Sequence, residues 1–191
     1  MKEILNMMIV LALICGISGV TLAVLKQTTA PIIEEQELTY VQAPAIAQVL
    51  EKHDNNPIKD RKRFEVDGKS VMVFPAISGG KVTSVAFETS GKGYGGNIGV
   101  MVGFDLETNT LTGIGITTLK ETPGLGMRVT EHGYTTQFKG HSIESMNLTK
   151  NGGDIEAVAG ATISSTGTVF AVQQAIAIYK NLKAKLANGW S

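Results

Sequence analysis

The chain has 191 residues, a formal net charge of zero and a single cysteine, Cys15. A chain of this length has room for one domain with an appendage. The balanced charge offers no basic stripe for nucleic acid, and one cysteine excludes both an intrachain disulfide framework and a cysteine-based zinc site. The three histidines lack the spacing of a metal site and are expected at the surface.

An uncharged apolar run from Ile4 to Leu25 opens the chain, with Lys2 and Glu3 before it and Lys26 after it. At about 1.5 Å per residue, its helix would measure about 33 Å and could cross a hydrocarbon core of about 30 Å. The alternative is a cleaved signal peptide, whose apolar region is usually shorter, about 7–15 residues. We therefore predict an uncleaved membrane anchor over residues 1–27. Its orientation is poorly marked, since single lysines flank both ends.

Residues 28–65 are predicted to form a stalk, a short helix with its apolar residues at helical spacing, and a polar loop from His53 to Arg63. From Val66 the period of the apolar residues changes to two, which is typical of strands. Strands are predicted at about 66–74, 82–89, 98–104, 111–119 and 143–148. Successive strands joined by short turns favour an antiparallel sheet.

The most regular pattern begins at Ser165, where apolar residues recur every three or four positions to near the C-terminus. It predicts a long helix that lays one face against the sheet. A shorter helix is predicted at about Thr130 to Phe138. The fold class is therefore α+β: a single N-terminal transmembrane helix, then a domain over residues 66–191 with a mainly antiparallel sheet packed by helices.

Three glycine-containing places could let a ligand approach the backbone: residues 93–96, residues 124–126 and Gly160. Each has a plain alternative, namely a hairpin loop, a type II turn with glycine at its third position, and a tight helix entry. A phosphate at the start of the last helix would meet free N–H groups and the positive end of the helix dipole. Ser164 and Ser165 add hydroxyl groups there, and one of the serines or threonines is predicted to be the N-cap.

Five segments, in a fixed order, carry a resemblance to a known family. They are Gly93–Gly96, Ile98–Asp105, Glu121–Gly126, Gln137–Gly140 and Asp154–Ser165. The Glu-Thr-Pro-Gly-Leu-Gly run of the third segment combined with the Gly-Ala-Thr of the last is specific, whereas neither alone would be. From about Val66 onward, the chain resembles the FMN-binding domain family, and within it the G subunit of the Rnf electron transport complex.

The resemblance implies that Thr162 carries FMN through a phosphoester made by a separate flavin transferase. Other residues of the matching segments are implied to surround the flavin: Tyr94, Gly95, Glu121, Thr122, Gly124, Leu125, Gly126, Gly160, Ala161, Ser164 and Ser165. Ala159 stands where many relatives have serine, which leaves the acceptor intact. No catalytic residue and no metal ligand are expected, because the cofactor carries the electrons. Asp154 is expected to order the turn before the last helix, without a partner indicated by the sequence.

The function implied is that of a membrane-anchored electron carrier in an ion-translocating ferredoxin:NAD oxidoreductase. Its domain would lie on the outer (periplasmic or extracellular) face of the cytoplasmic membrane. Its partners would be integral-membrane subunits with flavin and iron–sulfur centres, the flavin transferase and membrane lipid, without nucleic acid. Two alternatives stay open. One is the equivalent C subunit of a sodium-translocating NADH:quinone reductase, which is generally longer, and the other is a non-redox binding or assembly module that shares the fold.

Overall fold

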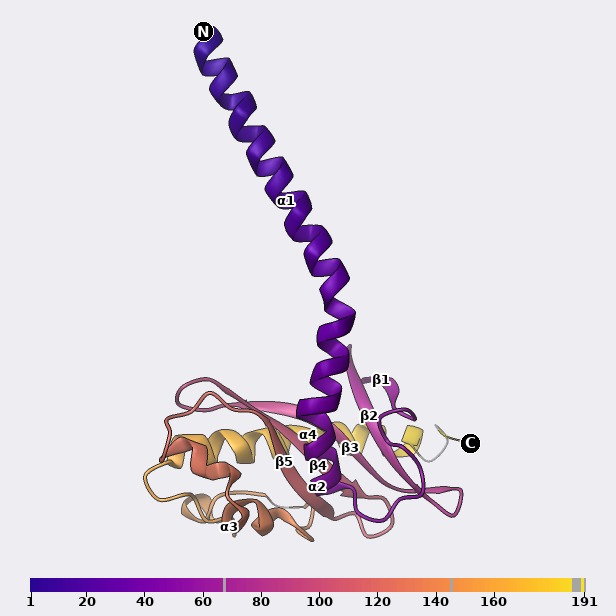
Figure 1. Ribbon diagram of the computed structural model, residues 1–191. Helices are drawn as coiled ribbons and strands as arrows, with labels where there is room; N and C mark the ends of the chain where they lie inside the picture. The colour runs from indigo at the N-terminus through magenta and orange to yellow at the C-terminus, as the bar shows by residue number, and fades with distance from the viewer. Residues whose placement is uncertain (67, 145, 187–189, 191) are drawn as a thin grey trace. The chain divides into compact units, whose positions relative to one another are not determined.

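The structure, a computed structural model, describes residues 1–66, 68–144, 146–186 and 190. Its internal contacts divide the chain into two units, Met1–Tyr40 and Val41–Ser191. The first unit is helical and the second is a sheet covered by helices (Figure 1).

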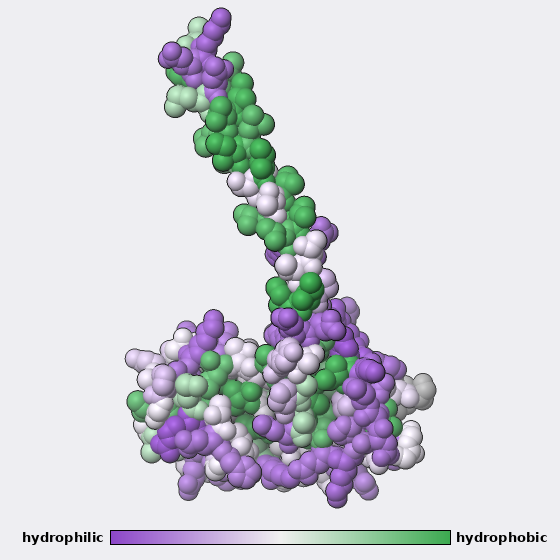
Figure 2. Space-filling view, in the orientation of Figure 1, coloured by the Kyte–Doolittle hydropathy of each residue, from purple (hydrophilic) through white to green (hydrophobic). Residues whose placement is uncertain are grey.

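The first unit consists of helix α1, Lys2–Gln36, and the beginning of a π-helix, η1, Glu37–Gln42. No side chain of α1 is buried, and most of its exposed surface is apolar (Figure 2). Within the described residues, one continuous helical stretch, Lys2–Val49, is long and apolar enough to span a membrane by length and composition. The helix expected for the anchor is present, and it continues to Gln36, past the predicted end of the anchor at residue 27.

The second unit is built on a five-stranded antiparallel sheet in which each strand pairs with the next along the chain. The strands are β1 (Lys62–Val66), β2 (Lys69–Ser78), β3 (Lys81–Lys92), β4 (Asn97–Asp105) and β5 (Leu111–Thr118). The predicted antiparallel α+β domain is confirmed. β1 falls in part where a loop was predicted, because this edge strand has only Phe64 and Val66 as apolar residues.

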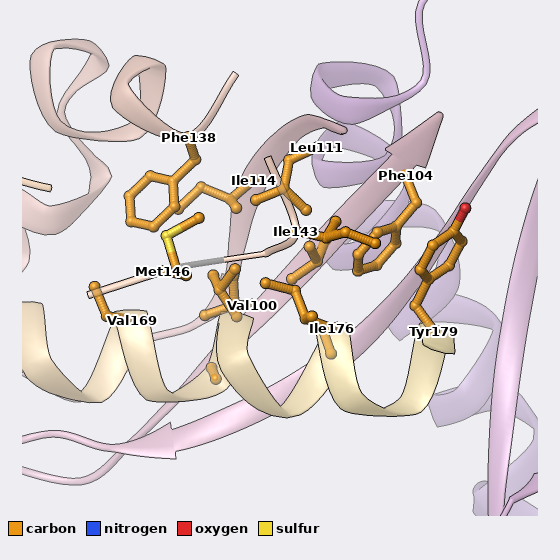
Figure 3. Packing of buried hydrophobic residues seen from close by; sticks show 14 of the residues in the cluster. Val100, Phe104, Leu111, Ile114, Phe138, Ile143, Met146, Val169, Ile176 and Tyr179 are labelled. Atoms are coloured by element: carbon orange, nitrogen blue, oxygen red, sulfur yellow. The ribbon is translucent and has the colours of Figure 1, made fainter. Parts of the chain in front are cut away.

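Helix α4, Thr162–Leu186, packs on one face of the sheet over β3 and β4, which confirms the predicted C-terminal helix. Val169, Ile176 and Tyr179 point from it into the core (Figure 3). The ring of Tyr179 stacks on Phe104 with centroids 4.4 Å apart, and Phe104 stacks in turn on Phe87 at 5.3 Å. Each such pair adds about 0.5–1.5 kcal/mol to the burial of the rings. The helix is therefore fixed firmly against the two central strands.

Helix α2, Ala43–Val49, packs on the opposite face, over β4 and β5. Helix α2 can pack close to the sheet because two residues of the sheet at this place are glycines. A Cβ atom added to Gly103 would lie 2.9 Å from the Cβ of Val49, and one added to Gly115 would lie 2.9 Å from the Cβ of Ala45. Both separations are shorter than ordinary van der Waals contact. The two glycines thus make a seat for the helix that follows η1.

Replacing Gly115 with alanine is expected to lower the free energy of unfolding by about 1–3 kcal/mol, because the new methyl group overpacks the seat of α2. The added Cβ would also lie 3.0 Å from the Cα and carbonyl oxygen of Ala45, which are backbone atoms. Urea unfolding of the full chain in detergent, followed by circular dichroism, measures the change. The matched control is Gly133→Ala, where a Cβ meets nothing within 4 Å. Equal stability of the two variants would contradict the seat.

Short turns of helix fill the connection from β5 to α4. They are η2 (Gly126–Thr130), α3 (His132–Thr135), η3 (Thr136–Phe138) and η4 (Thr149–Asn151). A single helix from Thr130 to Phe138 was predicted, but the extended backbone of Glu131, with ψ 142°, interrupts it. The strand predicted at 143–148 is wrong for the described residues of that segment. Ile143 and Met146 are buried in the core (Figure 3), and among the described residues of this segment only Leu148 pairs, in an isolated bridge with Ile155.

Candidate functional site

A cavity of about 490 Å³ opens where three segments that are distant in the sequence meet. They are the loop between β3 and β4, the turn after β5 and the start of α4. The lining residues are Tyr94, Glu121, Thr122, Leu125, Gly126, Gly160, Ala161, Thr162, Ile163 and Ser164. All except Ile163 belong to the set implied by the sequence. The other members of that set, Gly95, Gly124 and Ser165, lie beside the lining residues rather than among them.

Glu121, which is only 9% exposed, joins the three segments through its carboxylate. One oxygen, Oε1, accepts the backbone N–H of Gly95 at 3.1 Å, and the other, Oε2, accepts the hydroxyl of Ser164 at 2.9 Å. A buried polar group is costly unless it is hydrogen-bonded. Here the donors come from the other two segments, so the same bonds that satisfy the carboxylate also hold the cavity walls together.

Two glycines make room for that carboxylate. A Cβ atom added to Gly93 would lie 2.2 Å from Oε1 of Glu121, and one added to Gly126 would lie 2.5 Å from Oε2. The Cβ on Gly126 would also come within 2.8 Å of the Ser164 hydroxyl oxygen. A side chain at either position would therefore displace the carboxylate and break its bonds to the neighbouring segments.

The turn at Pro123–Gly124 has the features of the type II turn that was weighed against a ligand-binding loop. The N–H of Leu125 donates to the carbonyl of Thr122 at 3.2 Å, and Gly124 has φ +74°. A positive φ at this position favours glycine. The turn also contributes Leu125 to the cavity, against Gly160, where an added Cβ would lie 2.8 Å from the leucine side chain. The type II turn is therefore confirmed, and the same turn lines the cavity.

The start of α4 differs from the prediction in one respect. The helix begins at Thr162, so the residue before it is Ala161 and the predicted serine or threonine N-cap is wrong. Ser165 lies inside the helix and fixes the entering chain instead. Its hydroxyl donates to the carbonyl of Ala161 and accepts the N–H of Val158, both at 3.0 Å. The hydroxyl of Ser165 thus fixes the start of the helix from inside its first turns, not from the N-cap position.

Thr162 is exposed on the wall of the cavity. Within the described part of the chain, its hydroxyl has no hydrogen-bond partner, and only its carbonyl is used, by Thr166. The first N–H groups of a helix have no partner inside the helix, and the positive end of the dipole lies beside them. Thr162 therefore combines an unpaired hydroxyl with a helix end that attracts anions.

Three residues that hold α4 in place, Tyr134, Gly91 and Gly167, could not be predicted from the sequence to do so. Tyr134 donates its phenol hydroxyl to the carbonyl of Ser165 at 3.2 Å, and burial raises the pKa of Tyr134 to about 12, which keeps the phenol a donor. Gly91 and Gly167 let β3 and α4 touch, since a Cβ on Gly91 would lie 1.9 Å from the Gly167 carbonyl oxygen. A glycine inside an apolar helical pattern was the only signal for this close approach.

Asp154, whose partner could not be predicted, pairs with His141. The Nε2 atom of His141 lies 2.7 Å from both carboxylate oxygens, and its Nδ1 atom lies 2.8 Å from the carbonyl oxygen of Ser142. The imidazole ring of His141 therefore lies between the carboxylate of Asp154 and the carbonyl oxygen of Ser142. The side chain of His141 is only 10% exposed, so the expectation of a surface histidine is wrong here.

The hydrogen bond from His141 holds the pKa of Asp154 below its usual range. A lowered folded-state pKa stabilises the fold above about pH 4, where the unfolded carboxyl is ionised, and this stabilisation is lost as the pH falls through the folded-state value. The side chain of Asp154 is 67% exposed, so solvent screening limits the effect. We expect Asp154→Asn to lower the free energy of unfolding by about 0.5 kcal/mol at about pH 6, and by less as the pH falls.

Urea unfolding of the wild type and of Asp154→Asn across this pH range measures the difference. Glu156→Gln is the matched control, because it removes an exposed carboxylate two residues away that has no side-chain partner among the described residues. A destabilisation that grows toward low pH would contradict the assignment.

Sequence comparison relates the chain to a known family. Residues 93–177 match the model of the FMN-binding domain. The chain is 31% identical to the G subunit of the ion-translocating oxidoreductase complex of Methanosarcina acetivorans, over 92% of this chain and 94% of the relative. It is 34% identical to the G subunit of the same complex from Stutzerimonas stutzeri, over 87% of this chain and 76% of the relative.

Solved structures with a similar fold are subunits of another enzyme. The C subunit of the Na⁺-translocating NADH-quinone reductase of Parabacteroides distasonis superposes with a TM-score of 0.53 at 24% identity, over 60% of this chain and 63% of that one. The NqrC protein of Shewanella oneidensis also has a TM-score of 0.53, at 22% identity, over 78% of this chain and 74% of that one. At these identities the likeness concerns the fold alone.

Proposed function

The chain belongs to the family of G subunits of ion-translocating oxidoreductase (Rnf) complexes, and we propose that it carries FMN on Thr162 and relays electrons inside such a complex. Its apolar N-terminal helix anchors it in the membrane. The observation that carries the proposal is the meeting of the Gly95 loop, the Glu121 turn and the free hydroxyl of Thr162 at one cavity.

The residues around the cavity suit both ends of a flavin mononucleotide. The volume lies within the range of about 300–1,000 Å³ that is usual for ligand sites. Exposed apolar side chains, those of Tyr94, Leu125 and Ile163, offer surface for an aromatic ring system. The start of α4 offers N–H donors and a positive dipole for a phosphate.

The chain itself contributes attachment, positioning and protection of the cofactor. The hydroxyl oxygen of Thr162 would lose its proton and bond to the phosphorus of FMN. A separate flavin transferase would bring FMN as part of an activated flavin dinucleotide, whose phosphoanhydride bond breaks and whose nucleoside monophosphate leaves. Glu121 would keep the walls together, and Leu125 would limit the access of water. When bound, the flavin supplies the electron-transfer chemistry. An ester bond also prevents loss of the cofactor to dilute solution, so the pocket is free to tune the potential.

The proposal includes the place and the partners of the domain. We place the sheet domain on the outer face of the cytoplasmic membrane, where it would exchange electrons with integral-membrane subunits that hold flavin and iron–sulfur centres. A reporter protein that is active only in the cytoplasm can be fused after Ser191. Activity of this fusion would contradict the orientation. The equivalent role in a quinone reductase is the second candidate. It is supported by the fold likeness alone, whereas the Rnf relatives reach 31–34% identity.

Flavin fluorescence on a denaturing gel tests the function. We expect a fluorescent band at the mass of this chain after co-expression with a flavin transferase, and no such band without the transferase. A second acceptor protein expressed in the same cells serves as the control for transferase activity. An unlabelled chain beside a labelled control would overturn the proposal and favour a non-redox binding or assembly module.

A further inference from the structure

The solvent-facing side of α4 carries no charge over most of the helix. From Ala157 to Tyr179 the sequence has no acidic or basic residue, and the first is Lys180. Five residues at helical spacing form this side, which we name the uncharged stripe: Ile163, Thr166, Phe170, Gln174 and Ala177. A helix at the surface of a soluble domain normally has charged residues opposite its buried face. The stripe is therefore unusual for a surface exposed to water.

The stripe begins at the mouth of the cavity. Ile163 lines the cavity and is 54% exposed, and Phe170, two turns along, is 50% exposed. At about 1.5 Å per residue, the stripe extends about 21 Å from Ile163 to Ala177. The Gln174 side chain donates to the carbonyl of Ser90, so it adds a polar group without a charge.

The exposed large hydrophobic side chains of the second unit gather in this region. Among its described residues, they are Tyr94, Leu125, Met127, Ile163 and Phe170. Three of them line the cavity, Met127 follows the same turn, and Phe170 lies on the stripe. Single exposed apolar residues are normal, but their concentration beside one cavity marks an interaction site.

We propose that the uncharged stripe and the exposed apolar side chains around the cavity mouth dock against another protein of the same complex, one that presents an uncharged, apolar surface. These side chains are those of Tyr94, Leu125, Met127 and Ile163. This inference rests on the proposed function, since the contact would bring a partner to the mouth of the flavin cavity. The cores of protein interfaces are depleted of charge and enriched in aromatic residues, as this surface is. The contact is therefore continuous with the site that it serves.

A lipid surface and a second copy of the chain fit less well. Helices that lie on a membrane carry Lys and Arg along their polar side, whereas the stripe has none before Lys180. A second copy docked on the same surface would cover the mouths of both cavities and close them to any electron donor.

An uncharged contact also has a consequence for solution behaviour, because salt screens only charges. We expect the association to persist at high concentrations of NaCl.

The test uses the full chain, expressed with the other subunits and purified as a complex in detergent. Phe170→Glu places a charge in the middle of the stripe without changing a cavity-lining residue. We expect at least about a tenfold loss of recovery with the other subunits, because burial of an unpaired charge opposes association. Ala177→Glu, at a small exposed position near the end of the stripe, should weaken recovery in the same direction. Lys183→Glu is the control. It changes the net charge of α4 by more than either stripe variant does, but it lies outside the stripe.

Circular dichroism of each purified variant shows whether the domain has folded, and flavin fluorescence on a denaturing gel shows whether it has been loaded. Loss of the complex by both stripe variants, with the wild-type dichroism spectrum kept and with Lys183→Glu unaffected, supports the docking surface. Recovery of Phe170→Glu and Ala177→Glu at the wild-type level overturns it. A benzophenone amino acid at position 170 identifies the occupant: cross-links to another protein of the complex support the proposal, and cross-links only to lipid or to a second copy overturn it.

The outcomes separate this inference from the function on which it rests. If the wild-type chain proves to lack covalent flavin while the stripe variants still leave the complex, the flavin proposal fails and the docking surface stands. If the wild type carries flavin and the stripe variants remain in the complex, the docking surface fails and the flavin proposal stands.

Discussion

Replacing Thr162 with alanine is expected to reduce covalent flavin to background, whereas Thr162→Ser should retain a labelled fraction. The neighbouring hydroxyls offer no substitute, because those of Ser164 and Ser165 are buried and hydrogen-bonded. The hydroxyl of Thr166 donates to the carbonyl of Thr162 and lies outside the cavity lining. Fluorescence per chain on a denaturing gel, after co-expression with the transferase, measures the difference.

The stability of the Thr162→Ala variant separates loss of the acceptor from loss of the fold. Thr162 is exposed, and surface substitutions usually change the free energy of unfolding by less than about 0.5 kcal/mol. We expect the unlabelled variant and the unlabelled wild type to unfold at nearly the same urea concentration. Covalent flavin that persists in Thr162→Ala would remove this residue from the attachment site.

Replacing Glu121 with alanine is expected to lower the free energy of unfolding by about 1–3 kcal/mol, because it leaves the buried hydroxyl of Ser164 and the part-buried N–H of Gly95 without their acceptor. The N–H of Gly95 and the hydroxyl of Ser164 would lose their partner, and the three walls of the cavity would lose their common link. We therefore also expect less flavin to be attached to each chain. Urea unfolding and gel fluorescence measure the two effects.

Glu121→Gln is the matched control for the loss of these bonds. Its amide oxygen can accept from Gly95, and its amide group can donate to the hydroxyl of Ser164, which is able to accept. We expect this variant to keep most of the stability and most of the flavin. Equal behaviour of the alanine and glutamine variants would show that the two hydrogen bonds do not hold the walls together.

The parts of the fold that the sequence predicted are those with a strong local period. The strands with alternating apolar residues and the long C-terminal helix were found at nearly their observed places. The edge strand β1 was largely missed, because its sequence alternates only over Phe64 and Val66. The seat of α2 was missed for another reason: it depends on two glycines of the sheet, Gly103 and Gly115, that lie far from the helix in the sequence.

The candidate site shows the same division. Glycines and a threonine before a helix were visible as a local pattern, and the structure brings them to one cavity. The bond between Glu121 and Ser164 was not visible, because it joins residues 43 positions apart. The partner of Asp154 was likewise hidden, since His141 lies in a segment without regular periodicity. Local patterns predict the elements, whereas such contacts depend on how the elements pack.

Peptide mass spectrometry tests the attachment at Thr162 most directly. Cleavage after Lys150 and Lys180 releases one peptide that contains Thr162 together with the other hydroxyl residues of the first turns of α4. We expect this peptide, from the chain co-expressed with a transferase, to gain the mass of one FMN less one water. Backbone fragmentation should place the added mass on Thr162. A peptide without added mass, or with the flavin on one of the other hydroxyl residues, would contradict the account.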